Sequence, residues 1–297
     1  MATASIVIPA HNEESVIGDL LAGLGAQPPG RFEIIVVCNG CTDDTAAVAR
    51  RQAPEVTVIE IAEASKRLAL IEGDEAATSF PRLYVDADVQ LTAASVDLLV
   101  AALSNGRLLA VAPERRVPRD GVSAWVRWYY DVWEQLPQVR AGLFGRGVIA
   151  LSERGNARVR SLPALMGDDL IASEAFSPSE RAIVPGAEVT VWPPRTLGDL
   201  LRRRVRAATG NAEADSAGLR SSTSVTSWGV LSEMARGKPS LIPKMLVFVG
   251  VGVASRIRAR RAIREGDSTT WLRDDSSRVR TPALRADDEH RSDVVSE

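Results

Sequence analysis

Cysteine and histidine are scarce in this sequence, and their scarcity excludes several kinds of protein. Among 297 residues there are two cysteines, Cys38 and Cys41, so a disulfide framework cannot be built. Besides His11 there is only His290, near the C-terminal end, and no second cysteine pair exists, so we do not expect a zinc site. A redox pair of the thioredoxin type is the minor alternative for Cys38 and Cys41, because they follow a predicted strand and precede a predicted helix.

The chain also lacks a large net charge. Its formal charge of −2 gives no general attraction for nucleic acid, so we expect no nucleic-acid partner. Residues 1–5 lead directly into a predicted strand without a basic stretch and an apolar core, so no signal peptide is visible. The compartment predicted from these features is the cytoplasm.

A long hydrophobic run is missing as well. The most apolar segment, 241–254, is short for a membrane-spanning helix and contains Lys244. Five arginines follow directly, at positions 256, 258, 260, 261 and 264. An apolar segment beside basic residues fits a peripheral contact with the inner face of the cell membrane. It fits equally well a helix that packs on the domain and has a solvated basic end.

Strands and helices alternate over about 1–115. Apolar runs that end in turn residues predict strands at 5–9, 33–37, 56–61, 82–85 and 108–112, with helices at about 13–24, 42–53, 66–78 and 92–104. Alternation with short turns is typical of a mostly parallel sheet. The predicted fold class is therefore α/β, with a mostly parallel central sheet flanked by helices and a C-terminal helical or disordered tail.

Beyond residue 115 the pattern is looser. An aromatic helix carries Trp125, Trp128, Tyr129 and Trp133 at helical spacings, which favours either core packing or a platform for stacking a substrate. A glycine-rich turn at 142–147 precedes a strand at 148–151. A strand at 187–192 and a basic helix at 197–208 follow.

Polar residues follow three of the predicted strands. They lie at 9–14, at 38–45 and at Asp86-Ala87-Asp88. Parallel strands bring their carboxyl ends to one edge of the sheet, where α/β proteins bind ligands. Two carboxylates two residues apart offer the hard oxygen ligands that Mg²⁺ or Mn²⁺ prefers, with phosphate oxygens as further ligands.

This ordered set of motifs resembles the family-two glycosyltransferases with the GT-A fold, over about residues 5–211. The family's opening motif, Pro-x-x-Asn-Glu, is matched by Pro9, Asn12 and Glu13, and its metal motif, Asp-x-Asp, by Asp86 and Asp88. The family's later acidic pair is matched by Asp168 and Asp169, and its element Gln/Arg-x-x-Arg-Trp is approached by residues 203–207. The turn after the second strand is matched by Asn39, Gly40, Thr42, Asp43, Asp44 and Thr45.

The chain also departs from the family's motifs. Cys38 stands where the family has an aspartate that contacts the nucleotide base. Ala207 stands where long processive polymerases have a tryptophan beside the acceptor, which argues against that class. The element that begins at Lys66 is only partly kept, with Ile71 in place of an asparagine.

The resemblance implies an inverting transfer of a sugar from a nucleotide-diphosphate sugar, most often a UDP-sugar, to a hydroxyl of a glycan, lipid-linked or small-molecule acceptor. It implies Mn²⁺ or Mg²⁺ as the cofactor, with Asp88 as direct ligand and Asp86 toward the ribose or a metal-bound water. Asp169 is the expected general base and Asp168 its neighbour or alternate. The expected nucleotide-sugar-binding residues are Pro9, His11, Asn12, Glu13, Asn39, Asp43, Lys66, Asp86, Arg203 and Arg206.

The expected organisation is a GT-A domain at 1–235, divided into a nucleotide-binding half at 1–115 and an acceptor-binding half at 116–235. An apolar and then arginine-rich segment at 236–264 and a polar, largely disordered tail at 265–297 would follow.

Simpler or different interpretations stay open. Asp168 and Asp169 could cap a helix, and the arginines at 202–206 could form a solvated basic face. A sugar-nucleotide nucleotidyltransferase shares the sheet and the carboxylates, although the loop at 10–13 is acidic rather than phosphate-binding. A non-catalytic domain that binds nucleotide sugars is the remaining alternative.

Overall fold

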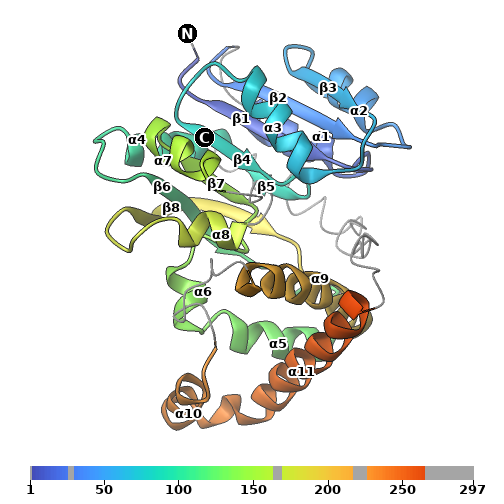
Figure 1. Cartoon of the computed structure of the whole chain (residues 1–297), viewed down its shortest axis with the longest axis vertical. Coiled ribbons are helices and arrows are strands. Elements are labelled where there is room, and N and C mark those ends of the chain that lie inside the picture. The colour runs from blue at the N-terminus through green and yellow to red at the C-terminus, as the bar shows by residue number, and fades with distance from the viewer. Residues whose placement is uncertain (1, 26–29, 163–168, 217–225, 265–297) are drawn as a thin grey trace, which may run out of the picture.

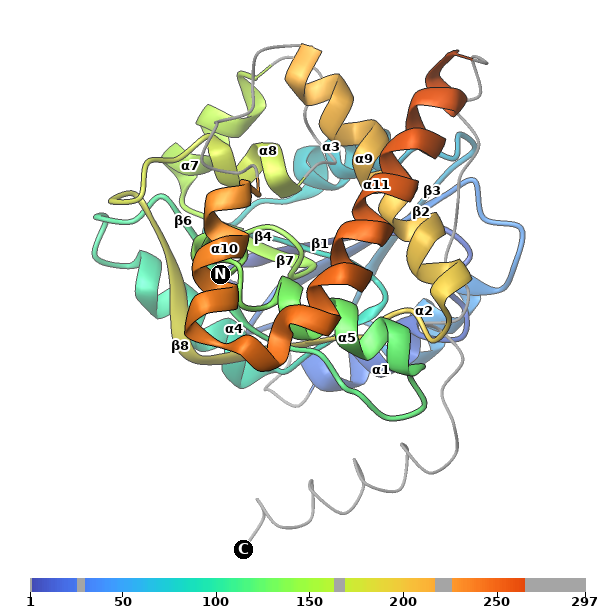
Figure 2. The same ribbon diagram turned by 90° about the horizontal axis from the view of Figure 1, so that it is seen from below.

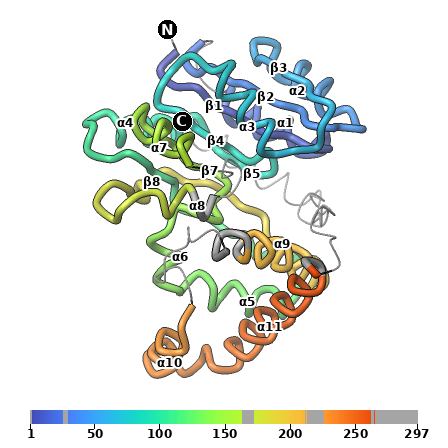
Figure 3. The backbone as a smooth tube through the Cα atoms, viewed as in Figure 1, coloured from blue at the N-terminus to red at the C-terminus, as the bar shows by residue number. Residues whose placement is uncertain are grey.

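The computed structural model describes residues 2–25, 30–162, 169–216 and 226–264. A curved sheet with helices on both faces forms one part of the molecule, and a layer of helices lies below it (Figures 1 and 3). The α/β class is therefore confirmed. The predicted tail at 265–297 lies outside the described residues.

Within the described residues, eight strands form one mixed sheet in the order β3-β2-β1-β4-β7-β6-β8-β5. Their bounds are β1 Ser5–Ala10, β2 Glu33–Asn39, β3 Thr57–Ile61, β4 Arg82–Val85, β5 Val89–Leu91, β6 Ala110–Arg116, β7 Val148–Leu151 and β8 Arg181–Val191.

The two halves of the sheet differ in the relative direction of their neighbouring strands. Strands β3, β2, β1 and β4 are all parallel, as the alternating sequence pattern predicts. Strand β7 runs antiparallel to both β4 and β6, and β5 runs antiparallel to β8. Strand β6 therefore does not continue the parallel series beside β4, because β7 lies between them.

Helices cover both faces of the parallel half. Helices α1 (Ile17–Leu24), α2 (Thr45–Gln52) and α4 (Ala93–Leu103) pack on the face to which β1 turns Ile6 and Ile8. Helix α3 (Lys66–Ala76) packs on the opposite face. A Cβ atom at Gly73 would lie 2.4 Å from Cγ1 of Val7, so a glycine is needed where α3 crosses β1.

Helix α1 begins four residues later than the apolar pattern predicts. The backbone N–H groups of Glu13 and Glu14 donate to Oγ1 of Thr45 and Oδ2 of Asp43. The residues before Ile17 are therefore held in a turn by the loop after β2 instead of entering the helix.

The second half adds further helices, α5 Ala124–Trp133, α6 Pro137–Ala141, α7 Glu153–Arg160, α8 Asp169–Glu174, α9 Leu197–Ser216, α10 Trp228–Gly237 and α11 Ile242–Arg264, with a 3₁₀ turn at Pro239–Leu241. Helices α5, α9 and α11 share one apolar cluster, and α10 joins α5 and α11 in a second. Seen from below, α10 and α11 lie in front of the sheet (Figure 2).

The aromatic helix α5 divides its large side chains between core and surface. Tyr129 and Tyr130 are buried, and Tyr129 stacks on Phe248 of α11 with ring centroids 5.1 Å apart. Trp125 and Trp128 are exposed and contact each other edge to face. Of the two interpretations drawn from the sequence, core packing therefore holds for Tyr129 and does not hold for Trp125 and Trp128.

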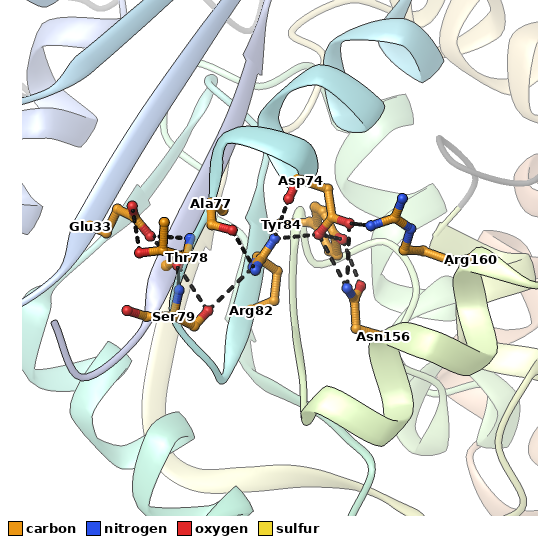
Figure 4. Close-up of polar contacts among 10 residues, drawn as sticks. Glu33, Asp74, Ala77, Thr78, Ser79, Arg82, Tyr84, Asn156 and Arg160 are labelled. Carbon is orange, nitrogen blue, oxygen red and sulfur yellow. Dashed lines mark hydrogen bonds and ion pairs between the residues drawn. The ribbon is translucent and has the colours of Figure 1, made fainter. Parts of the chain in front are cut away.

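A buried carboxylate joins α3 to β4 and α7 at the end of the sheet opposite the polar motifs. Asp74 accepts hydrogen bonds from Arg82, Tyr84, Asn156 and Arg160, with Oδ1 2.6 Å from Nη1 of Arg82 and Oδ2 2.6 Å from Nη1 of Arg160 (Figure 4). Burial, and then the charge of Asp74, raise the pKa of Tyr84, so its hydroxyl stays protonated and donates.

Glu33, in the same region, is a second carboxylate held by donors (Figure 4). Burial raises its pKa, but hydrogen bonds from Ser5, Thr78 and Ser79 outweigh burial and leave the pKa lowered. A lowered pKa means that the contribution of Glu33 to stability is present above the pKa of the unfolded chain and is lost as pH falls through the folded value.

Asp74→Ala should destabilise the protein by about 3–5 kcal/mol, because it leaves the buried Arg82 without its counter-charge. Chemical denaturation measures the change. Asp97→Ala is the matched control, since it breaks the more exposed pair with Arg31 and should cost about 1 kcal/mol or less. An equal loss of unfolding free energy in the two variants would show that the buried hydrogen bonds of Asp74 stabilise the protein no more than an exposed ion pair does.

Candidate functional site

The carboxyl ends of β1, β2 and β4 meet at one edge of the sheet. Ala10, the last residue of β1, is opposite Cys38, and Val7 is opposite Tyr84. The three polar motifs predicted from the sequence therefore leave the sheet side by side.

The loops after β1 and β2 are joined by hydrogen bonds between backbone N–H groups and side chains. Asn12 has a left-handed backbone with φ 54°, a conformation that asparagine tolerates better than most residues. Its Oδ1 accepts the N–H of Thr42 at 2.7 Å, and its own N–H donates to Sγ of Cys41. Glu13 is buried by the same interlocking.

His11 and Asn39 hold the bases of these two loops together. Nδ1 of His11 donates to the carbonyl oxygen of Asn39 at 2.6 Å, and Nδ2 of Asn39 donates to the carbonyl oxygen of Ala10 at 2.9 Å. Oδ1 of Asn39 is buried and accepts no hydrogen bond within the part of the chain that the structure describes.

The carboxylate of Asp43 already accepts hydrogen bonds from its own turn and from the loop after β1. Oδ1 accepts from the N–H and hydroxyl groups of Thr45, and Oδ2 accepts the N–H of Glu14. Its geometry fits a residue that shapes the loop more directly than one that contacts a ligand.

Lys66 and Asp86 form an ion pair at this edge. Ser65 caps α3 by accepting the N–H of Leu68, which places Lys66 in the first turn of the helix. Nζ of Lys66 lies 2.5 Å from Oδ1 of Asp86, and both side chains are about one-third exposed, at 35% and 38%. The structure thus brings together two predicted residues that are 20 positions apart.

Asp88 is linked to the basic helix through β5 and β8. Val89, the residue after Asp88, pairs with Val191, and the same register continued by one residue sets Asp88 opposite Trp192, just beyond the ladder. Nη1 of Arg203 donates to the carbonyl oxygen of Trp192 at 3.1 Å. Arg203 is therefore anchored in the same neighbourhood, while Arg206, one turn further along α9, is exposed.

The glycine-rich turn before β7 also reaches the site, which sequence reasoning missed. The carbonyl oxygen of Gly147 accepts the N–H of Asp86 at 2.7 Å. Gly147 has φ 65°, and a Cβ there would lie 2.5 Å from Val89 and 3.3 Å from Oδ2 of Asp86. The density of glycines at 142–147 is the sequence signal that points to this close approach.

Two arginines beside that turn form a positive region. The guanidinium of Arg115 lies 4.2 Å from the centroid of the Trp133 ring and donates to the carbonyl oxygen of Gly145. Arg146 is buried and donates to backbone carbonyls. Burial, and then the charge of Arg115, lower the pKa of Arg146 to about 10.

The predicted base lies at the start of α8. Asp168 is outside the described residues, and Asp169 is the first residue of the helix. Oγ of Ser173, in the same helix, accepts the N–H of Leu143 at 3.0 Å. Helix α8 is therefore attached to the glycine-rich turn that reaches Asp86.

The burial and the pKa of Cys38 favour a structural role for the cysteine pair. Both thiols are free, and Cys38 is buried. Burial, and then the charge of Cys41, raise the pKa of Cys38 to about 12. A thiol with so high a pKa is a poor nucleophile, which disfavours the redox interpretation.

The described residues contain no cluster of three or more His, Cys, Asp or Glu side chains arranged to hold a metal ion. Asp86 and Asp88 flank the buried Ala87 and are both partly exposed. A pair of carboxylates fits a divalent cation that takes its other ligands from water and a substrate diphosphate, the usual arrangement for Mg²⁺.

Residues 5–149 match the sequence model of glycosyl transferase family 2. This part of the chain, just under half of it, is therefore similar to family-two glycosyltransferases. An uncharacterised glycosyltransferase of Mycobacterium tuberculosis is 34% identical over 113 residues, which are 38% of this chain and 49% of that protein. The undecaprenyl-phosphate 4-deoxy-4-formamido-L-arabinose transferase of Pseudomonas savastanoi pv. phaseolicola is 33% identical over 42% of this chain and 38% of its own. The chain thus spans half or less of these relatives.

Solved structures share the GT-A fold of this domain. A mannosyltransferase from Pyrobaculum calidifontis, in complex with GDP-Man and Mn²⁺, aligns with a TM-score of 0.58 at 18% identity, over 90% of this chain and 79% of its own. A glucosyl-3-phosphoglycerate synthase from Mycobacterium tuberculosis, with Mn²⁺, UDP and glucosyl-3-phosphoglycerate, aligns with a TM-score of 0.53 at 21% identity, over 74% and 82%. At these identities the likeness establishes the fold alone.

Gly147→Ala should lower the free energy of unfolding by about 2–3 kcal/mol, because it combines backbone strain with overlap against Val89. Gly106→Ala is the matched control: Gly106 has φ 68°, and a Cβ there would meet nothing within 4 Å, so this variant carries the strain alone. Thermal unfolding of both variants measures the difference, and identical losses would mean that the close approach of Gly147 to Val89 contributes nothing.

Proposed function

We propose that this protein transfers a sugar from a nucleotide-diphosphate sugar to a hydroxyl group of an acceptor, with inversion at the anomeric carbon and with Mn²⁺ or Mg²⁺ as cofactor. The observation that carries the proposal is the meeting of the β1, β2 and β4 ends beside the Lys66–Asp86 pair. The match of residues 5–149 to the model of glycosyl transferase family 2 supports the same reaction class.

Asp88 and Asp86 are the proposed metal-binding residues. When bound, a divalent cation would neutralise charge that collects on the departing diphosphate. Asp88 would be a direct ligand, and Asp86 would face the ribose or a metal-bound water. Lys66 lies 2.5 Å from Asp86, so its ammonium group could also contact a phosphate oxygen next to the same carboxylate.

The remaining predicted residues would hold the donor. The interlocked turns around Pro9, His11, Asn12, Glu13 and Asn39 supply a rigid wall at the strand ends, which fits a binding surface for the nucleoside. Asp43 would act by keeping that wall in shape, since its carboxylate is taken up within the turn.

Arginines from α9 would bind the diphosphate. The anchoring of Arg203 at Trp192, opposite Asp88, supports this role for it. Arg206 lies one helical turn further and would add a second guanidinium, a group whose paired donors match phosphate oxygens.

The acceptor would be activated by Asp169. A hydroxyl group has a pKa far above neutral, so a carboxylate must take its proton as the acceptor oxygen attacks the anomeric carbon. The bond from that carbon to the diphosphate oxygen breaks in the same step, which inverts the configuration. The attachment of α8 to the turn beside Asp86 supports Asp169, with Asp168 as its alternate.

The donor and the acceptor are proposed as classes of compound. A UDP-sugar is the proposed donor, because the family resemblance implies one and a structural neighbour was solved with UDP. The proposed acceptor is a glycan, a lipid-linked compound or a small molecule, in polysaccharide or lipid-linked glycan synthesis at the cytoplasmic side of the membrane. A relative that is named for undecaprenyl phosphate supports a lipid-linked acceptor.

Asp88→Ala should reduce the release of nucleoside diphosphate at least about 100-fold, because several kcal/mol of charge stabilisation would be lost. The release should depend on Mn²⁺ or Mg²⁺ in the unaltered protein. A panel of nucleotide sugars, screened first by thermal shift with Mn²⁺, identifies the donor for the assay.

Asp120→Ala, at an exposed loop position, is the control for the Asp88 variant and should keep full activity. Release of pyrophosphate would indicate a nucleotidyltransferase instead. Binding of a nucleotide sugar without any turnover would indicate a non-catalytic domain, and either result would overturn the proposal.

Asp169→Asn should lower kcat by about 100-fold to 10,000-fold while donor binding is unchanged, because the amide cannot accept the acceptor's proton. Titration with the donor and initial rates with acceptor separate the two effects. Normal transfer by this variant would show that another group is the base.

A further inference from the structure

Helix α11 has two different faces. On one side Met245, Val251, Ser255 and Ala259 are buried, with exposures between 2% and 8%. Phe248 stacks on Tyr129, and Nζ of Lys244 lies 2.7 Å from Oδ2 of Asp131. These contacts fix the helix on the rest of the helix layer along one side.

The opposite side carries a stripe of exposed apolar residues. Leu246 is 74% exposed, and Ile242, Val253 and Ile257 are each 48% exposed. At about 100° per residue these four positions lie within about 60° of one another on the helix surface. We call them the α11 stripe.

Basic residues continue the α11 stripe toward the end of the helix. Arg260 and Arg264 fall on the same side by helical spacing, and Arg256 and Arg261 flank them, whereas Arg258 lies about 130° from the middle of the stripe. All five arginines are exposed, and α11 contains no Asp or Glu. Apolar surface thus lies directly beside concentrated positive charge.

We propose that the α11 stripe and the four arginines beside it, Arg256, Arg260, Arg261 and Arg264, form a docking surface for an anionic lipid membrane, with α11 lying in the plane of the surface. Charge complementarity selects this occupant, because an anionic surface neutralises the arginines, whereas a second copy of α11 would bring no acidic side chain to them. Two further exposed side chains, Trp125 on α5 and Trp228 on α10, are 53% and 76% exposed, on helices that share apolar clusters with α11 and lie near it in the view from below (Figure 2). Tryptophan favours the membrane–water boundary.

An in-plane position fits better than a span across the bilayer. Residues Pro239–Arg261 are long and apolar enough to cross a membrane by length and composition. One side of the helix, however, is packed on α5 and α9 and includes the ion pair of Lys244 with Asp131. A helix with one apolar side free and the other side on a folded domain matches an interfacial helix.

Sedimentation of the full chain with vesicles tests the proposal. The protein should pellet with vesicles that contain phosphatidylglycerol and stay in solution with pure phosphatidylcholine, and salt should release it. Replacing Arg256, Arg260, Arg261 and Arg264 by glutamine should weaken binding by about 100-fold or more, since each basic residue near an anionic surface contributes about fivefold.

The apolar part needs its own variant and a matched control. Leu246→Gln with Val253→Gln should weaken vesicle binding at least about tenfold. Leu98→Gln removes a leucine of 42% exposure from α4, in the sheet part of the molecule, and should leave binding unchanged. All replaced side chains are exposed, and unchanged thermal unfolding checks that each variant is folded.

Three results would overturn the proposal. The full chain could stay in solution with anionic vesicles, it could resist extraction by alkaline carbonate as a spanning helix does, or light scattering could show a dimer that Leu246→Gln abolishes. The surface is separate from the proposed transfer reaction: Asp88→Ala should still bind vesicles, so failure of one proposal is distinguishable from failure of the other.

Discussion

The parallel pairing of β1 with β2 and β4 is the constraint on which the candidate site depends. Parallel strands end at the same edge, so three polar segments from distant parts of the sequence leave the sheet together. The contacts at that edge use this arrangement, including the interlocked loops at Asn12 and Thr42 and the Lys66–Asp86 pair. A sheet with another strand order would scatter the same side chains.

The antiparallel half of the sheet brings further residues to the edge at which Asp86 and Asp88 lie. Strand β7 returns beside β4, and its preceding turn brings Gly147 against Asp86. Strand β8 pairs with β5 and so carries Trp192 and the anchored Arg203 to the position opposite Asp88. The short strand β5 starts one residue after Asp88, so the Asp-x-Asp segment lies at the junction of the two halves.

Local patterns in the sequence predicted the parts that depend on local physics. The apolar runs of β1 to β4 and the helices between them are visible because burial on a sheet face imposes regular spacing. The placement of β7 between β4 and β6 is set by long-range pairing, which no spacing records. For the same reason the approach of Gly147 to Asp86 was missed. The role predicted for Asp43 rests on its residue type, while its hydrogen bonds within the turn depend on the partner loop.

The helix layer shows why total charge is a poor guide to a surface. The chain has a formal charge of −2, yet α11 combines Lys244 and five arginines with no acidic residue. Lys244 is paired with Asp131, so the positive charge that faces solvent is concentrated toward the C-terminal end of the helix. Because charges are screened beyond about 8 Å at physiological salt, an approaching surface responds to that local cluster and not to the acidic residues elsewhere. A protein that is slightly acidic as a whole can therefore present a strongly basic face.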